Sequence, residues 1–186
     1  MKIESEVFAV PLRLGEPSDA PCISVLGMQV FLDTYATRGV SPSLATEVLE
    51  RLSPTAVSAL FNKAATRFIV AEREGHLMAF AQLTLGATHR LLADLPASEV
   101  DRLYVQERFA GTGLGTLLLR QAESLVAAQG NAAVWLTAWS GNERALAFYA
   151  NRGYRDLGCT TYVFGGEAYE NRLFLKHPLG SGAQRS

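Results

Sequence analysis

A glycine-rich junction between a predicted strand and a predicted helix constrains the fold of this chain more than any other stretch. Residues 105–119 are VQERFAGTGLGTLLL, with Gly111, Gly113 and Gly115 at alternate positions before leucines at helical spacing. The first amides of a helix lack internal partners and lie at the positive end of its dipole, and glycine lets a phosphate approach closely. The junction therefore predicts either an anion-binding turn or a structural corner in which glycine only permits tight packing.

The spacing of the glycines disfavours two common nucleotide-binding motifs. It matches neither G-x-x-x-x-G-K-[ST] nor G-x-G-x-x-G, because a single residue separates Gly113 from Gly115 and Thr116 follows. A nucleoside triphosphatase or a dinucleotide-dependent enzyme is therefore not expected.

Hydrophobic spacing predicts strands and helices on both sides of this junction. Ser41 and Ser53 each precede a proline, an arrangement typical of helix starts, since serine caps and proline suits the first helical position. Glu74 and Gly75 between two apolar runs predict a hairpin. Further strands are predicted at 6–14, 97–105, 132–139, 154–164 and 169–179, and further helices at 113–128 and 142–153. The pattern predicts an α/β fold with one mixed sheet and helices on its faces.

Length and composition indicate one globular domain. The chain has 186 residues, 48% of them hydrophobic and 9% aromatic, which is enough to form a sizeable core. We expect a single domain over residues 1–178 and a flexible tail over residues 179–186. The 17 basic and 18 acidic residues give a net charge of -1, which disfavours a nucleic-acid or anionic-membrane partner.

Targeting segments and metal-binding clusters are not evident in the sequence. No stretch resembles a secretory leader or approaches the roughly twenty apolar residues of a membrane span, so we expect a cytoplasmic protein. Cys22 and Cys159 are too few for a disulfide framework; we expect reduced, buried thiols and no acyl-cysteine route. The three histidines form no cluster, so no metal is expected, and His89 is assigned to a loop, at the substrate entrance or simply at the surface.

A second set of residues follows the last of the strongly apolar strands. In NERALAFY, Asn142 and Tyr149 are seven residues apart, about two helical turns, so they share a face with the small Ala145 between them. An amide and a phenol separated by a small residue form a shelf for an elongated ligand. Each also has an ordinary explanation, Asn142 as a helix cap and Tyr149 as half-buried packing.

Together and in this order, EVDRLYVQERFAGTGLGTLLL and VWLTAWSGNERALAFYANRGY resemble the Gcn5-related N-acetyltransferase (GNAT) superfamily. The resemblance implies a mostly antiparallel central sheet. It also implies direct transfer of an acetyl group from acetyl-CoA to a primary amine of a small molecule or peptide in a ternary complex, with coenzyme A as product. More loosely, WLTAWSGNERALAFY and the ending YVFGGEAYENRLFLKHPL are similar to the spermidine-acetylating PaiA type.

The resemblance also implies which residues bind the cofactor. Backbone groups of the strand would pair with the pantetheine arm, the junction amides would hold the pyrophosphate, Asn142 would contact the arm and Tyr149 would lie near the sulfur. The implied residues are Leu103, Tyr104, Val105, Ala110, Gly111, Thr112, Gly113, Leu114, Gly115, Thr116, Asn142 and Tyr149. The family usually has Gln or Arg where this chain has Ala110, which cannot make the same side-chain interaction, and Arg108 is a candidate replacement.

Acetylation of an amine needs a neutral nucleophile and a proton for the departing thiolate. Glu99 is the first candidate base because it lies on the strand that would flank the cofactor, and Asp101, at the same strand parity, is the reserve. A β-bulge would break this parity argument, and either carboxylate could simply be solvated. Tyr149 is the candidate general acid, and a strand amide near Leu103 or Val105 would stabilise the tetrahedral intermediate.

The acceptor is the least constrained part of the prediction. Asp94, Glu99 and Asp101 make the region acidic, which favours a cationic amine such as a polyamine or a peptide amino terminus; an aminoglycoside fits the same facts. The alternative function is a catalytically weak or inactive acetyl-CoA-binding sensor, against which Tyr149 together with Asn142 favours an enzyme. The last strands offer an edge for a possible homodimer.

Overall fold

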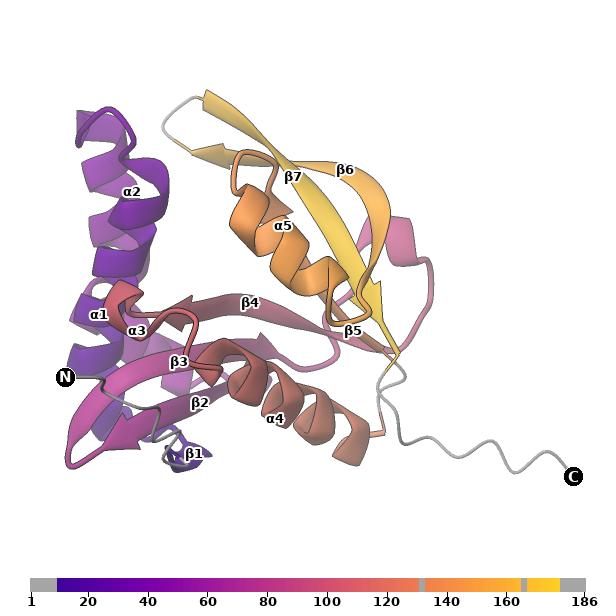
Figure 1. Ribbon diagram of the computed structural model, residues 1–186, viewed down its shortest axis with the longest axis horizontal. Coiled ribbons are helices and arrows are strands. Elements are labelled where there is room, and N and C mark those ends of the chain that lie inside the picture. Colours follow the sequence, from indigo (N-terminus) through magenta and orange to yellow (C-terminus); the bar gives the residue numbers. More distant parts are fainter. Residues whose placement is uncertain (1–9, 131–132, 165–166, 178–186) are drawn as a thin grey trace, which may run out of the picture.

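A seven-stranded sheet forms the frame of the computed structural model, which describes residues 10–130, 133–164 and 167–177 (Figure 1). Its strands are β1 (Leu12–Leu14), β2 (Thr66–Arg73), β3 (His76–Thr84), β4 (Ala97–Val105), β5 (Ala133–Trp139), β6 (Arg155–Phe164) and β7 (Glu167–Lys176). They lie in the order β1-β2-β3-β4-β5-β7-β6, and every neighbouring pair is antiparallel except β4 and β5. The predicted mixed, mostly antiparallel sheet is confirmed.

Helices cover this sheet and begin largely where the sequence predicts. They are α1 (Ala20–Tyr35), α2 (Pro42–Leu52), α3 (Pro54–Phe61), α4 (Leu114–Ala128) and α5 (Glu143–Ala150), with 3₁₀ turns at Pro17–Asp19, Arg90–Leu92 and Glu107–Phe109. The hydroxyl of Ser41 accepts a hydrogen bond from the Leu44 amide at 3.2 Å, and that of Ser53 accepts one from the Ala56 amide at 3.2 Å. The two Ser-Pro pairs therefore start α2 and α3 as expected.

The β2–β3 hairpin turns at the predicted pair of residues. Glu74 and Gly75 have φ of 53° and 78°, the left-handed backbone that a two-residue hairpin turn requires. The amino-terminal strand is shorter than expected, since β1 comprises only Leu12–Leu14 and residues 6–9 lie outside the described ranges. The expected tail, residues 179–186, also lies outside them.

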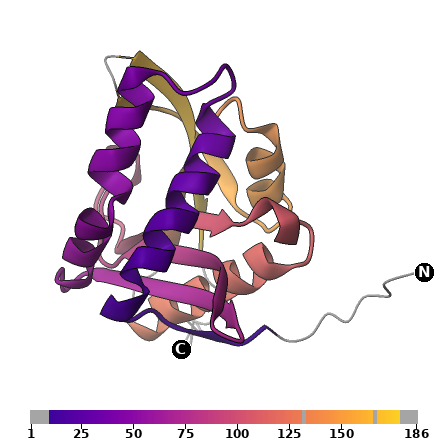
Figure 2. The same ribbon diagram turned by 90° about the vertical axis from the view of Figure 1, so that its left-hand side faces the viewer.

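Side chains of β2 alternate between two hydrophobic cores on opposite faces of the sheet. Phe68 and Val70 pack with residues of α1 and α3, whereas Ile69 and Ala71 pack with residues of α4 and α5. Such a period of two requires a covering layer on each face. Figure 2 shows α1 and α2 side by side in front of the strands, so helices cover both faces as predicted.

β4 and β5 stay together over only a short distance. Their parallel pairing comprises three residue pairs, from Ala97–Ala133 to Glu99–Trp135. Beyond these pairs β4 continues to Val105 and β5 to Trp139, so the two strands diverge and their facing edges have no strand partner in the described sheet. The resulting opening in the middle of the sheet positions the candidate site.

A β-bulge interrupts β4 beside this opening. β3 pairs Gln82 with Arg102 but Leu83 with Val100, which leaves Asp101 as the extra residue. The regular alternation that sequence parity assumes is therefore interrupted at Asp101.

Both cysteines are exposed and free rather than buried as expected. α1 turns Ile23 and Leu26 inward, so Cys22 falls on its outer side. Sγ of Cys159, on β6, accepts a hydrogen bond from Arg172 at 2.9 Å.

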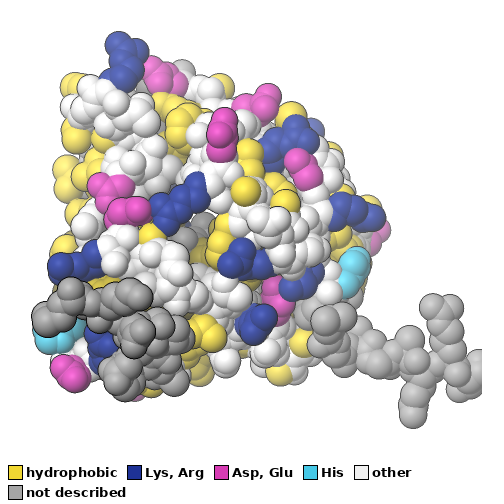
Figure 3. Space-filling view, viewed as in Figure 1, with side chains coloured by type: hydrophobic (Ala, Val, Ile, Leu, Met, Phe, Trp, Pro, Cys, Tyr) yellow, Lys and Arg dark blue, Asp and Glu magenta, His cyan; other side chains and the backbone are white. Residues whose placement is uncertain are grey.

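Basic and acidic side chains are interspersed over the face of the molecule seen in Figure 3, in keeping with the small net charge. Within the described ranges, no helix is both long and apolar enough to cross a membrane.

Candidate active site

Two glycines with a left-handed backbone build the turn that precedes α4. Gly111 and Gly113 have φ of 78° and 92°, a conformation that residues with a Cβ rarely adopt, although neither has a neighbour within 4 Å of a Cβ placed there. Gly113 is the N-cap of α4 and has no side chain that could accept a hydrogen bond from the first-turn amides. This geometry leaves those amides for an anionic ligand.

Gly115 serves a different purpose from the two glycines before it. A Cβ at this position would lie 3.3 Å from Cζ of Phe148, so the glycine lets α5 pack against the first turn of α4. Gly115 therefore forms the tightly packed corner, whereas Gly111 and Gly113 shape a turn whose free amides suit an anion, so the two alternatives from the sequence concern different glycines.

A cleft of about 880 Å³ lies beside this turn, between α1, β4 and α5. Eight of the residues predicted to bind the cofactor line it: Leu103, Val105, Gly111, Gly113, Gly115, Thr116, Asn142 and Tyr149. Four others, Tyr104, Ala110, Thr112 and Leu114, do not. Leu114, the first residue of α4, is buried in the core. Oγ1 of Thr112 donates a hydrogen bond to the Phe109 carbonyl at 2.6 Å. Val30 and Thr34 of α1 also line the cleft, and no local sequence pattern indicates them.

Asn142 and Tyr149 lie at the two ends of α5. Oδ1 of Asn142 accepts a hydrogen bond from the Ala145 amide at 3.0 Å, so its capping role is confirmed, and the same side chain lines the cleft. Tyr149 is 9% exposed and packs against Phe174 with 5.8 Å between ring centroids. Burial raises the pKa of the Tyr149 phenol, which keeps it protonated at neutral pH.

The cation beside the turn comes from the end of α5 rather than from Arg108. Arg152 donates from Nε and Nη2 to Oγ1 of Thr116 at 2.9 and 2.6 Å, and its guanidinium carbon lies 3.6 Å from the centre of the Phe148 ring. Arg152 lines the cleft, whereas Arg108 stacks on Phe109 at 5.8 Å from the ring centroid. No carboxylate of the described residues lies within 4.0 Å of Arg152, so its charge is available to a ligand.

A second cavity, of about 510 Å³, lies on the opposite side of β4. Leu103 and Val105 line the first cleft, whereas Arg102 and Tyr104 line the second cavity, as the alternation of a strand requires. The remaining walls come from α1, α2, α3, β3 and β5 to β7. Residues 102–105 of β4 thus separate the two spaces.

Both predicted base candidates line this second cavity despite the bulge. Burial and the nearby Asp101 raise the pKa of Glu99 to about 7, while Arg102 acts in the opposite direction. Burial also raises the pKa of Asp101, against a hydrogen bond that its Oδ2 accepts from Thr84 at 2.8 Å. A carboxyl group that titrates near neutrality is suited to accept a proton from a nucleophile, so Glu99 is the better placed of the two.

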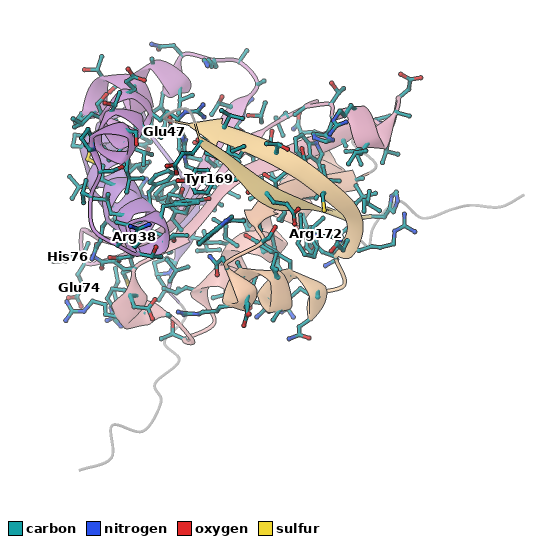
Figure 4. The ribbon with its side chains drawn as sticks, turned by 90° about the horizontal axis from the view of Figure 1, so that it is seen from above. Arg38, Glu47, Glu74, His76, Tyr169 and Arg172 are labelled. Atoms are coloured by element: carbon teal, nitrogen blue, oxygen red, sulfur yellow. The ribbon has the colours of Figure 1, made fainter. Side chains whose placement is uncertain are left out.

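The cavity also contains polar residues that sequence reasoning missed. Glu47 of α2 is 8% exposed, accepts a hydrogen bond from the Tyr162 hydroxyl and lies 2.6 Å from Nε of Arg51. Figure 4 shows Glu47 of α2 and Tyr169 of β7 between the helical layer and the β6–β7 hairpin. Asn171 of β7 is 5% exposed, and its Oδ1 has no hydrogen-bond partner. These residues come from distant segments, so no local pattern identifies them.

The charge of the cavity differs from the acidic site expected from sequence. Its charged lining residues are Glu47, Arg51, Lys63, Glu99, Asp101 and Arg102, three of each sign. Asp94 lines neither space. The charges of the cavity therefore do not favour a cationic acceptor, contrary to the expectation from sequence.

His89 has a structural position away from both spaces. Its Nδ1 accepts a hydrogen bond from the Leu91 amide at 3.2 Å, and its ring lies 5.2 Å from that of Trp135. It lines neither the cleft nor the cavity. Across the described residues, no group of His, Cys, Asp and Glu is arranged to hold a metal ion.

Comparison with known families identifies the family of a chain that contains this cleft and this cavity. The model of the acetyltransferase (GNAT) family matches residues 34–154, which include β4, α4 and α5. The chain belongs to the GNAT family of N-acetyltransferases. An uncharacterized N-acetyltransferase of Lactobacillus delbrueckii subsp. lactis is 22% identical over 158 residues, covering 85% of this chain and 91% of the relative.

Solved structures agree with this GNAT fold. An N-acetyltransferase from Staphylococcus aureus Mu50 superposes with a TM-score of 0.70 at 17% identity, covering 90% of this chain and 97% of that one. The PaiA N-acetyltransferase from Thermoplasma acidophilum, determined in complex with coenzyme A, gives a TM-score of 0.69 at 17% identity, covering 90% and 99%. The resemblance inferred from the two sequence motifs is confirmed.

Proposed function

We propose that this GNAT enzyme binds acetyl-CoA in the cleft and a primary amine of a small molecule or peptide in the second cavity, hereafter the acceptor cavity. The acetyl group is transferred directly between them in a ternary complex. The observation that carries this proposal is the divergence of β4 and β5, because their unpaired ends border both spaces. A thioester held on one side of the sheet can there meet an amine held on the other.

The residues of the cleft suit a CoA-type ligand, which when bound supplies an acetyl group activated as a thioester. The uncapped amides of α4 and the guanidinium of Arg152 are both positive and face the same space, so they fit a pyrophosphate. Arg152 would supply the side-chain interaction that Ala110 cannot make. The unpaired edge of β4 around Leu103 and Val105 fits the amide groups of a pantetheine arm as an added strand.

Glu99 acts as the general base in this proposal, with Asp101 as the reserve. Its raised pKa of about 7 leaves a substantial fraction ionised at neutral pH and makes that fraction a stronger base than an ordinary carboxylate. The proton of the attacking amine passes to Glu99, either directly or through a water molecule.

Tyr149 acts as the general acid that returns a proton to the departing thiolate. Its phenol lines the cleft and is protonated at neutral pH, so it carries a proton when the C–S bond breaks; burial raises its pKa and makes it a weaker acid than an ordinary tyrosine. An unpaired amide of β4 near Leu103 or Val105 is in position to stabilise the developing oxyanion.

The alternative function, an acetyl-CoA-binding sensor without turnover, needs the cleft but not a titrating carboxyl group across the sheet from it. The raised pKa of Glu99 therefore favours an enzyme.

Calorimetric titration with acetyl-CoA, with NAD and ATP as controls, tests the cleft. We expect micromolar binding of acetyl-CoA alone. Release of the free thiol is then measured with a panel of amines. Binding with thiol release supports the enzyme, binding without release across the panel supports the sensor, and absence of binding contradicts both.

A further inference from the structure

Asn171 presents an unsatisfied acceptor inside the acceptor cavity. Its side chain is 5% exposed, Oδ1 has no hydrogen-bond partner, and Nδ2 lies at the long distance of 3.5 Å from Oγ1 of Thr137. Buried polar atoms are almost always paired, because an unmade hydrogen bond in the interior costs stability. Asn171 lines the cavity while this oxygen is itself buried, so a rotation of the side chain would bring it to a ligand that donates an N–H.

Arg102 lines the same cavity and is a hydrogen-bond donor that has no carboxylate partner among the described residues. Its half-buried guanidinium donates to Oε1 of Gln82, which is itself only 4% exposed and so fixes the group against the wall, and it also interacts with the Tyr104 hydroxyl. Glu99 and Asp101 interact with it electrostatically, but no carboxylate of the described residues lies within 4.0 Å of it. The remaining N–H groups of a fixed guanidinium are suited to bind a carboxylate in two-point fashion.

The balance of charge in the cavity restricts the ligand further. Three carboxyl groups and three cations line it, and Glu99, with a pKa of about 7, is only partly ionised at neutral pH. The lining therefore has no excess of negative charge to compensate the two or more positive charges of a diamine or polyamine, and burying uncompensated charge is costly. A ligand with one amine and one carboxylate adds no net charge. The volume of about 510 Å³ lies within the range of small-molecule sites.

We infer that the acceptor is a zwitterion of amino-acid size, whose amine N–H donates to Oδ1 of Asn171 and whose carboxylate binds the guanidinium of Arg102. This inference rests on the proposed function and names its substrate class. In the transfer, the amine nitrogen bonds to the acetyl carbon and the C–S bond breaks. The zwitterion first releases one ammonium proton to solvent. As the neutral amine attacks, its second proton passes to Glu99 and the thiolate takes one from Tyr149, giving an N-acetyl amino acid, the free thiol and one released proton.

Matched acceptors test the inference. 4-Aminobutanoate, 1-aminobutane and 1,4-diaminobutane share one chain length and end in a carboxylate, a methyl group and an ammonium. A panel of L-amino acids with their decarboxylated amines, and spermidine, extends the test to the α-amino geometry. We expect at least one zwitterion to be acetylated with a kcat/KM about tenfold or more above that of its amine and diamine counterparts.

Variants then separate the two contacts. Arg102→Gln is expected to raise KM about tenfold for the preferred zwitterion and to change KM for its uncharged counterpart by less than about twofold, with Arg102→Lys intermediate. Asn171→Leu is expected to raise KM for both, since both carry the amine. Arg73→Gln, which removes an exposed charge of β2 outside the acceptor cavity, is the control and should match the wild type.

The outcomes distinguish this inference from the function on which it rests. If acetyl-CoA binds but the diamine or spermidine is acetylated as well as any zwitterion, or no zwitterion is acetylated, the substrate class is wrong while the cofactor assignment stands. Equal losses for charged and uncharged acceptors in Arg102→Gln would also overturn it. If acetyl-CoA does not bind, the proposed function itself fails.

Discussion

The cleft and the acceptor cavity border the same two strands but are built in different ways. Besides side chains of α1, β5 and α5, the cleft contains the backbone of one short segment, residues 103–116, with two left-handed glycines and the uncapped start of a helix. The acceptor cavity depends on side chains from α1, α2 and α3 and from β3 to β7. A site made by the backbone binds one kind of ligand, whereas a site made by scattered side chains can change specificity while the sheet stays intact.

The largest expected effect comes from altering the backbone of the cleft. Gly113 has φ of 92°, where a β-branched residue is strained, so Gly113→Val should weaken acetyl-CoA binding about 100-fold or more in calorimetric titration. Gly130→Val is the matched control, because Gly130 has φ of 77° just after α4 and outside the cleft. It should lower thermal stability while binding stays normal. Normal binding by Gly113→Val would show that the turn does not hold the cofactor.

Removing the proposed base tests the acceptor side of the comparison. Glu99→Gln should lower kcat about 100-fold with acetyl-CoA affinity unchanged. In the wild type, the rate should fall below a pKa of about 7 as Glu99 becomes protonated, and the variant should lack this limb of the pH profile.

The neighbouring carboxylate, Asp101, provides a second test of the acid side of this pH–rate profile. Asp101 raises the pKa of Glu99, so Asp101→Asn should move the limb to lower pH and retain more activity under mildly acid conditions. An unchanged limb in Glu99→Gln would assign the titration to another group.

Tyr149 lines the cleft, and in the proposed mechanism it protonates the thiolate that leaves at the boundary between the two spaces. Tyr149→Phe should lower turnover about tenfold and leave acetyl-CoA binding within about threefold, because it removes only a proton donor. Tyr154→Phe is the control, since the Tyr154 hydroxyl donates to Glu123 at 3.0 Å and lines neither space. Equal turnover in wild type and Tyr149→Phe would contradict the general-acid role.

The smallest effect is expected where a side chain supplements the backbone of the cleft. Arg152→Gln should weaken acetyl-CoA binding about fivefold and make it less dependent on salt concentration, because one cation near the phosphates is removed. Arg108→Gln removes a charge that stacks on Phe109 but does not itself line the cleft, and it should leave the dissociation constant within about twofold. Equal effects of the two changes would remove the special role of Arg152.

The cleft is more predictable from sequence than the acceptor cavity for a physical reason. The Ser-Pro helix starts, the Glu74-Gly75 hairpin and the glycine junction are local patterns, and each forms where expected. The bulge at Asp101 depends on how β4 pairs with β3, which no local spacing records. Asn171 enters the cavity only because β7 inserts between β5 and β6. Cys22 is exposed, contrary to prediction, because α1 has several apolar faces and only the packing decides which one is covered.

The three-residue contact between β4 and β5 also limits any single molecule designed to occupy both spaces. Such a molecule would have to pass through the sheet beyond the last pair, Glu99–Trp135, near Leu103 of β4 and Trp139 of β5. Paired strands lie about 4.8 Å apart, which leaves no room for a ligand between them, so the gap is narrow where it begins and suits an extended chain. A bisubstrate inhibitor of this enzyme therefore needs a slender, unbranched waist, and its bulk and its charges belong at the two ends.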